Sequence, residues 1–198
     1  GGGGGGGGGR QARGQGKCFA GCASAWARFG TAVAIDQQTV VVGAPQAGGT
    51  GQAYVYRYDG LTWIEEGTWI ASDAAAGDEF GFEVSVSAGR SVIGAPGHDS
   101  AGLQAGKAYL FLETAGVWSE ETMLTAPDAS PFDRFGTGAS INGNDVMIGS
   151  PGDDLPTIPE IGAAYFFRNS GGIWASEQKL VPPTPTFTGW FGYSVSIK

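Results

Sequence analysis

The residue types that most often carry catalysis are scarce in this chain. His98 is the single histidine among 198 residues. Nucleophilic triads and zinc proteases need histidine at the reacting centre, and the neighbourhood of His98 shows no nucleophile elbow. Asp153 and Asp154 are adjacent carboxylates, the residue type that glycosidases use as acid and base. Since neighbouring residues in an extended segment point apart, we expect no catalytic site and no cofactor.

Carboxylates in the longer loops offer oxygen ligands for a hard cation. They are Asp99, Asp153, Asp154 and Glu160. Calcium takes about six to eight oxygens, so these side chains would have to converge on one point. The alternative, which we favour, is that they are solvated loop carboxylates.

Two groups of residues could be modified covalently. Cys18 and Cys22 are close enough in sequence for a small disulfide, with two free thiols in a turn as the alternative. Thr184, Thr186 and Thr188 lie in a Pro/Thr cluster, a composition typical of O-glycosylated segments, and we treat them as candidate acceptors.

Composition excludes several classes of protein. Lys and Arg number 11 against 19 Asp and Glu, a net charge of −8, whereas nucleic-acid binding needs clustered cations. Aromatic residues make up 12% and charged residues only 15%, the reverse of a disordered chain. No apolar run approaches the roughly 18 residues of a membrane-spanning helix. We therefore expect neither a nucleic-acid partner nor a membrane span, and predict an ordered, glycine-rich β protein.

An internal repeat must position these side chains. Phe-Gly recurs at steps of 51, 55 and 56 residues, and is followed by Gly-Ala-Pro or Gly-Ser-Pro, by Ala-Tyr and by a tryptophan. The landmarks are Phe29, Gly30, Phe80, Gly81, Phe135, Gly136, Phe191 and Gly192, with Trp63, Trp118 and Trp174. We expect each phenylalanine and tryptophan to pack between neighbouring repeats, and each glycine to lie where a Cβ would collide. A sugar-binding platform is the alternative role for the tryptophans.

Each period predicts four short strands and almost no helix. The first strand follows Phe-Gly, the second ends at Gly-Ala-Pro, the third contains Ala-Tyr and the fourth contains the tryptophan. Short polar turns between the first two strands suit tight hairpins. The expected ranges are 31–35, 39–42, 52–58 and 63–70, then 82–87, 91–93, 107–113 and 118–124, then 137–141, 145–148, 163–168 and 174–181. Four antiparallel strands repeated radially describe a β-propeller blade, with a β-sandwich as the alternative.

At these landmarks the chain resembles the FG-GAP repeat family, which forms the blades of the integrin α-subunit head. The resemblance covers residues 29–198 and is closest to the variety with Ala-Tyr and a following tryptophan. It implies an extracellular or cell-surface propeller used for adhesion, ligand binding or construction. Integrin-like blades often hold calcium between their first two strands. Here those connections are 36–38, 88–90 and 142–144, too short to wrap an ion, so calcium by that route is not expected.

The predicted organisation is a glycine-rich segment over 1–16 and a propeller over 17–198. Its complete blades span about 29–79, 80–134 and 135–190, with part of a preceding blade at Lys17–Ala20 and of a following blade at 191–198. We expect Tyr193–Lys198 to be a strand that pairs with the N-terminal segment. We favour pairing with another copy, and the alternative is pairing within one chain, which would close a small four-bladed ring. Gly1–Gly9 is either held within an assembly or marks positions whose side chains are not identified.

Three functions follow as hypotheses. The first is a non-catalytic extracellular structural or adhesive propeller, a subunit of a larger assembly such as a fibre, whose partners are other copies or further blades. The second is a propeller fragment of a longer integrin-like receptor or secreted protein, with extracellular protein or glycan ligands. The third is an extracellular hydrolase that uses loop carboxylates.

Overall fold

The computed structural model describes residues 26–154, 160–184 and 189–198, and it confirms the all-β, propeller-like prediction. Three antiparallel sheets each contain four consecutive strands. The strands are β1 (Val33–Asp36), β2 (Thr39–Ala44), β3 (Gln52–Tyr58) and β4 (Trp63–Trp69), then β5 (Val84–Ser87), β6 (Arg90–Ala95), β7 (Lys107–Thr114) and β8 (Val117–Leu124), then β9 (Gly138–Asn142), β10 (Asp145–Ser150), β11 (Ala163–Ser170) and β12 (Ile173–Leu180). The short 3-10 turn η1 (Ala47–Gly49) is the one helical segment in these ranges. No helix in the described ranges is long and apolar enough to cross a membrane.

The strands follow the predicted order with small shifts at their ends. Each Gly-Ala or Gly-Ser of the second landmark belongs to the second strand, and the proline after it, which has no N–H to donate, ends the pairing. The first strand of the first sheet begins at Val33 rather than at 31. The reason is a turn in which Thr31 N donates to Arg28 O.

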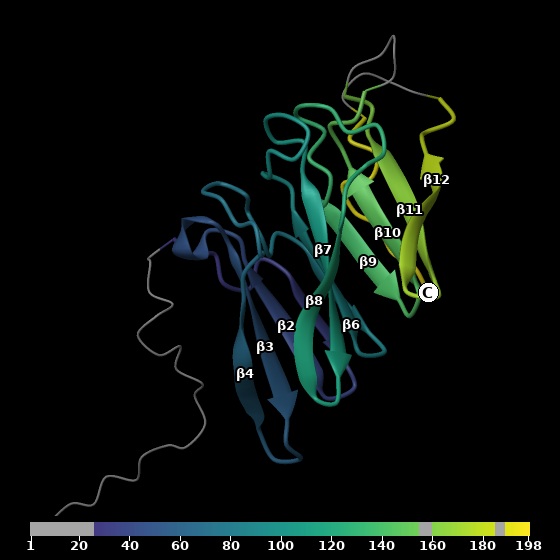
Figure 1. Ribbon diagram of the computed structural model, residues 1–198. Helices are drawn as coiled ribbons and strands as arrows, with labels where there is room; N and C mark the ends of the chain where they lie inside the picture. The colour runs from purple at the N-terminus through teal and green to yellow at the C-terminus, as the bar shows by residue number, and fades with distance from the viewer. Residues whose placement is uncertain (1–25, 155–159, 185–188) are drawn as a thin grey trace, which may run out of the picture.

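The sheets lie side by side in chain order, with their long loops at one end and their hairpins at the other (Figure 1). The first strands, β1, β5 and β9, lie close to one another and define the inner side of the arc. The pairing of third and fourth strands shifts register at equivalent points in every sheet: Val55/Tyr56, Leu110/Phe111 and Phe166/Phe167. Such bulges increase the local twist of a sheet, as a blade requires.

The apolar core lies between the sheets rather than inside one of them. Side chains alternate along a strand, so Val41 faces the second sheet and Val42 faces away from it. Phe80 is fully buried between the first and second sheets and contacts Tyr109 edge-on, with the ring centroids 5.3 Å apart. Phe135 repeats this arrangement against Tyr165 between the second and third sheets.

The Phe-Gly and Gly-Ala-Pro landmarks contact each other across neighbouring sheets. A Cβ added to Gly43 would overlap the carbonyl oxygen of Gly81, and one added to Gly94 would overlap that of Gly136. The same contact joins Gly149 to Gly192. The two motifs therefore recur together because each glycine leaves room for the backbone of the other.

The C-terminal residues correct one prediction. Residues 193–198 form no strand, although we expected one over Tyr193–Lys198. They lie against the third sheet, where Ile197 N donates to Ser140 Oγ at 3.2 Å and Phe191 forms a single parallel bridge with Gly162. A strand needs a backbone ladder, and this segment lies against the side chains of β9 with no further strand beside it among the described residues. The N-terminal segment expected to pair with it lies outside the described residues.

Candidate binding face

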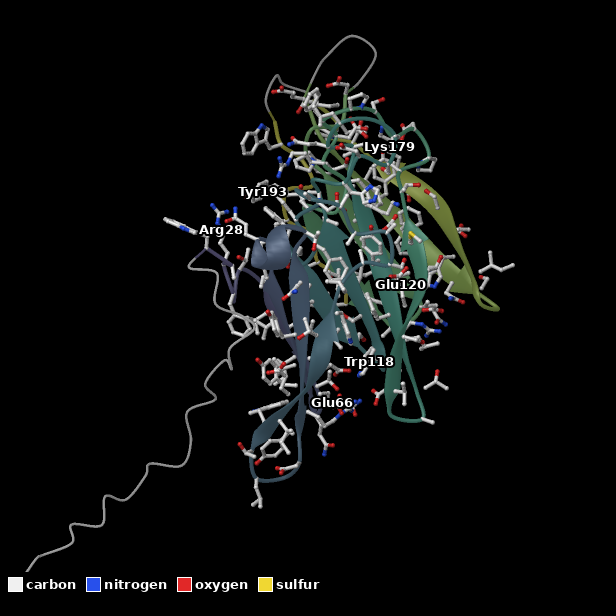
Figure 2. The ribbon with its side chains drawn as sticks, turned by 60° about the vertical axis from the view of Figure 1, so that its left-hand side comes forward. Arg28, Glu66, Trp118, Glu120, Lys179 and Tyr193 are labelled. Atoms are coloured by element: carbon white, nitrogen blue, oxygen red, sulfur yellow. The ribbon has the colours of Figure 1, made fainter. Side chains whose placement is uncertain are left out.

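An opening of about 590 Å³ lies at the loop end of the inner strands. Residues directly after Phe-Gly line it in the last three repeats, as Phe82, Thr137 and Tyr193, so it lies where a propeller has its axis. Loop residues complete the lining: Gln104, Pro131, Phe132, Arg134, Pro151, Gly152, Asp154, Glu160 and Trp190. In Figure 2, Tyr193 lies on the left of the molecule with Arg28, whereas Glu120 and Lys179 lie on the right.

A buried tyrosine links each of the last two sheets to the loop before it. Tyr109 donates to Asp73 Oδ1 at 2.6 Å, and Lys107 donates to the other carboxylate oxygen at 2.6 Å. Burial acts to raise the pKa of Asp73, but the hydrogen bonds from Lys107 and Tyr109 outweigh it and lower the pKa to about 2. His98 Nε2 lies 3.2 Å from Asp73 Oδ2. We call this group the first clasp.

A second group of the same kind, the second clasp, consists of Tyr165, Asp128, Asp153 and Lys179, and its lysine lies on a different strand from that of the first. Tyr165 donates to Asp128 Oδ1 at 2.7 Å and also to Asp153. Lys179 of β12 donates to both carboxylates at 2.7 Å. Burial raises the pKa of Tyr165, and the two carboxylates raise it further. The phenol therefore stays protonated as the donor in this group.

The four candidate metal ligands do not converge. Asp153 is buried and paired with Lys179, which corrects the expectation of a solvated side chain at this position. Asp154 is exposed, and its Oδ1 accepts the backbone N–H of Glu160 at 2.6 Å. Asp99 Oδ1 likewise accepts the N–H of Gln104 at 2.8 Å. Within the described residues, no group of three acidic, histidine or cysteine side chains could hold a metal ion.

The landmark aromatics differ between the interior and the ends of the arc. Trp118 and Trp174 are half-buried and pack against the clusters between sheets, whereas Trp63 is 41% exposed. Phe29 and Phe191 are 50% and 37% exposed, although Phe80 and Phe135 are fully buried. The landmark aromatic residues therefore pack between repeats where two sheets meet, and they are more exposed at the ends of the arc.

Most of the candidate sites of covalent modification lie outside the described residues. Thr184 is exposed, whereas Cys18, Cys22, Thr186, Thr188 and Gly1–Gly9 lie outside the described residues.

Sequence reasoning missed the axial opening and the clasps. The Ala-Tyr repeat was recognised, but its hydroxyl was not assigned a partner. A signal was present, because Asp73 and Asp128 are 55 residues apart, close to the repeat length. The opening had no such signal, since its loop residues differ in type between repeats.

Comparison with known families agrees with this geometry. The FG-GAP repeat model matches residues 14–56, 63–111 and 118–167, well over half of the chain. The second and third matches each begin in the fourth strand of one sheet and end in the third strand of the next, so they span the contacts between sheets. No curated protein matches the chain. From its repeats and from the interlocking glycines that explain them, the chain belongs to the FG-GAP repeat family.

Proposed function

We propose that this protein is a non-catalytic structural or adhesive propeller module that works outside the cell as a subunit of a larger assembly. FG-GAP repeats are typical of extracellular proteins, which supports the setting. The observation that carries the proposal is a pair of apolar sheet faces at the two ends of the described arc. Each face has an interior equivalent that is covered by a neighbouring sheet.

The first of these, the leading face, is carried by β1. Val33 and Ile35 are 62% and 63% exposed. Their equivalents on β5, Val84 and Val86, are 3% and 8% exposed because the first sheet covers them. At roughly 25 cal/mol per Å² of buried apolar area, covering such a face is strongly favourable. The leading face is therefore built for contact with another sheet.

The second, the trailing face, lies on the third sheet. Met147 and Phe166 are half-buried, whereas Val92 and Leu110, their equivalents on the second sheet, are fully buried. In the interior of the arc, this kind of face packs on the leading face of the next sheet. Residues 193–198 of the chain itself lie against β9, so the part of the trailing face that remains for a second copy is on β10 and β11. Contact of this part with the leading face of another copy gives a head-to-tail arrangement.

The absence of enzymatic activity is part of the proposal. The exposed Asp128 and the buried Asp153 both accept from Lys179 and from Tyr165, so their oxygens are already partnered within the protein. Their geometry serves the packing of loop against sheet. An activity screen against polysaccharides that detects hydrolysis, and loses it in the Asp153→Asn variant, would contradict this part.

The assembly is tested with two charge variants. Size-exclusion chromatography coupled to light scattering should show that the molar mass of the wild type exceeds that of a monomer and increases with protein concentration. Ile35→Glu blocks the leading face and Met147→Glu blocks the trailing face, so each variant alone should be a monomer. An equimolar mixture leaves one intact pair of faces and should give a heterodimer.

The control is Val117→Glu, an exposed position on the middle sheet, which should assemble as the wild type does. Circular dichroism checks that every variant keeps its β signal. A folded wild type that stays monomeric at all concentrations would contradict the assembly. A mixture that stays monomeric although the wild type assembles would contradict the head-to-tail geometry.

A further inference from the structure

We propose that the axial opening binds an uncharged saccharide through its loop rim. The rim consists of Gln104, Phe132, Arg134, Asp154, Glu160, Trp190 and Tyr193. The inference is independent of the assembly, because none of these residues belongs to the exposed pairs that define the leading and trailing faces.

The backbone supplies the first argument. Ten non-glycine residues in the described ranges have left-handed backbone, and half of them line this opening: Gln104, Phe132, Arg134, Glu160 and Trp190. Arg134 and Trp190 precede Phe-Gly, a position that is left-handed in every described repeat, as in Arg28 and Glu79. The other three replace a glycine of the first repeat, since Gly49 is equivalent to Gln104 and Glu160, and Gly77 to Phe132. Glycine adopts this conformation without steric cost, whereas a bulky side chain does not. Strained side chains gather at ligand sites, so the three that replace glycine here, Gln104, Phe132 and Glu160, point to a ligand.

The second argument is the exposed aromatic surface. Trp190 and Tyr193 stack with their ring centroids 5.9 Å apart and their planes 21° from parallel. The two residues are 57% and 52% exposed, and Phe132, which also lines the opening, is 56% exposed. Exposed rings beside a concave opening are typical of binding sites. A sugar ring, whose C–H bonds form an apolar face, fits against such flat surfaces.

The third argument is the polar complement of the rim. Arg134 is paired with Glu79 at 3.0 Å, so its charge is already balanced. Within the described residues, no protein group hydrogen-bonds the side chains of Gln104 and Glu160. A carboxylate accepts from hydroxyls, and an amide both accepts and donates. With the carboxylates of Asp154 and Glu160 exposed in the rim, an anionic ligand is disfavoured, and a neutral polyhydroxylated one is matched.

The probes are neutral tetrasaccharides of glucose, mannose, galactose and xylose, titrated into the full chain by calorimetry and tryptophan fluorescence. At least one should bind with a Kd below about 1 mM. Trp190→Ala should weaken that binding by about tenfold or more, since it removes the stacking surface. Phe132→Gly should also weaken binding, yet leave the melting temperature unchanged or higher, because it relieves the left-handed backbone.

The matched control is Trp63→Ala, which removes an exposed tryptophan on β4, outside the opening, and should leave the affinity unchanged. Tetrasaccharides of galacturonate and of glucosamine test anionic and cationic ligands. The proposal is overturned if none of the neutral probes binds at about 10 mM. It is also overturned if both rim variants bind as the wild type does, or if a charged probe binds more tightly than every neutral one.

Discussion

Two different constraints require glycine at single positions of this protein: a positive backbone angle φ, and close contact with the backbone of the next sheet. Gly81 and Gly136 have positive φ, at 89° and 94°, which alone favours glycine in the turn after phenylalanine. Gly43 and Gly94 have no such requirement, and their side-chain position is filled by the backbone of the next sheet. The two glycine landmarks thus have different physical causes.

Substitution of Gly94 tests the contact separately from the backbone angle. Gly94→Ala places a methyl group against the Gly136 carbonyl and should lower the free energy of unfolding by about 1–3 kcal/mol or more. Gly67→Ala is the matched control, since Gly67 also lies in a strand and has no atom within 4 Å of an added Cβ. Urea unfolding should show the control within about 1 kcal/mol of wild type. Equal losses in both variants would contradict the contact.

Asp133 gives a prediction with a defined pH range. It is buried, its Oδ2 accepts Ser130 N at 2.7 Å, and its Oδ1 has no partner within the described residues. Burial raises its pKa from 3.8 to about 6, and the nearby charges of Asp153 and Asp154 contribute. A carboxyl whose pKa rises on folding destabilises the fold as pH increases from the unfolded pKa to the folded one.

Asp133→Asn should therefore stabilise the protein at neutral pH. The difference from wild type should grow between about pH 4 and 6 and then level off, at a value on the order of 2–3 kcal/mol. Chemical unfolding at a series of pH values measures it. A variant that is less stable than wild type at pH 7 would show that the ionised carboxylate is stabilised in a way that the geometry does not reveal.

At the scale of strands and loops, the two clasps make the same loop-to-sheet contact but take their lysine from different strands. Each holds the loop after a fourth strand to a tyrosine of the following sheet. The first takes its cation from Lys107 on β7 and has Met123 on β8, whereas the second has Ala163 on β11 and Lys179 on β12. Both clasps therefore contain a lysine that binds the loop carboxylates, although this lysine lies on the third strand of one sheet and on the fourth strand of the other.

Because the two lysines lie on different strands, we predict that a lysine at position 163 on β11 can partly replace Lys179. Lys179→Met leaves the buried Asp153 without its cation and should cost about 3 kcal/mol of unfolding free energy. Adding Ala163→Lys copies the first clasp and should recover part of the loss, although Ala163→Lys alone adds an unneeded charge to a buried position. A double-mutant cycle measures the coupling. Strictly additive losses would contradict the equivalence of the two clasps.

Strand order and sheet number were predictable because they depend on patterns that recur. Phe-Gly and Gly-Ala-Pro mark contacts made by every sheet, so each repeat carries the same signal. The failure at Tyr193–Lys198 has a physical cause, since a β-like sequence forms no ladder without a neighbouring strand. The opening and the clasps escaped prediction because they join residues from different repeats, such as Tyr165 with Asp128, whose meeting depends on how the sheets pack.

For the whole molecule, the question is whether a divalent ion contributes to stability. The hairpins that hold calcium in integrin-like blades are two-residue turns here, and Lys179 occupies the space between Asp128 and Asp153. A Lys ammonium and a calcium ion compete for the same carboxylates, and burying both charges at one point would be costly. Removal of metal should thus leave the fold intact.

Thermal unfolding with excess chelator, compared with millimolar calcium, tests this at the scale of the whole chain. The melting temperature should agree within about 5 °C, which corresponds to roughly 1–2 kcal/mol for a protein of this size. The Lys179→Met variant sharpens the comparison, because it frees Asp128 and Asp153 to accept an ion. Calcium should then raise the melting temperature of the variant more than that of the wild type. A large loss of stability in the chelated wild type would mean that its loops hold an ion, and that pairing with Lys179 does not keep an ion from these carboxylates.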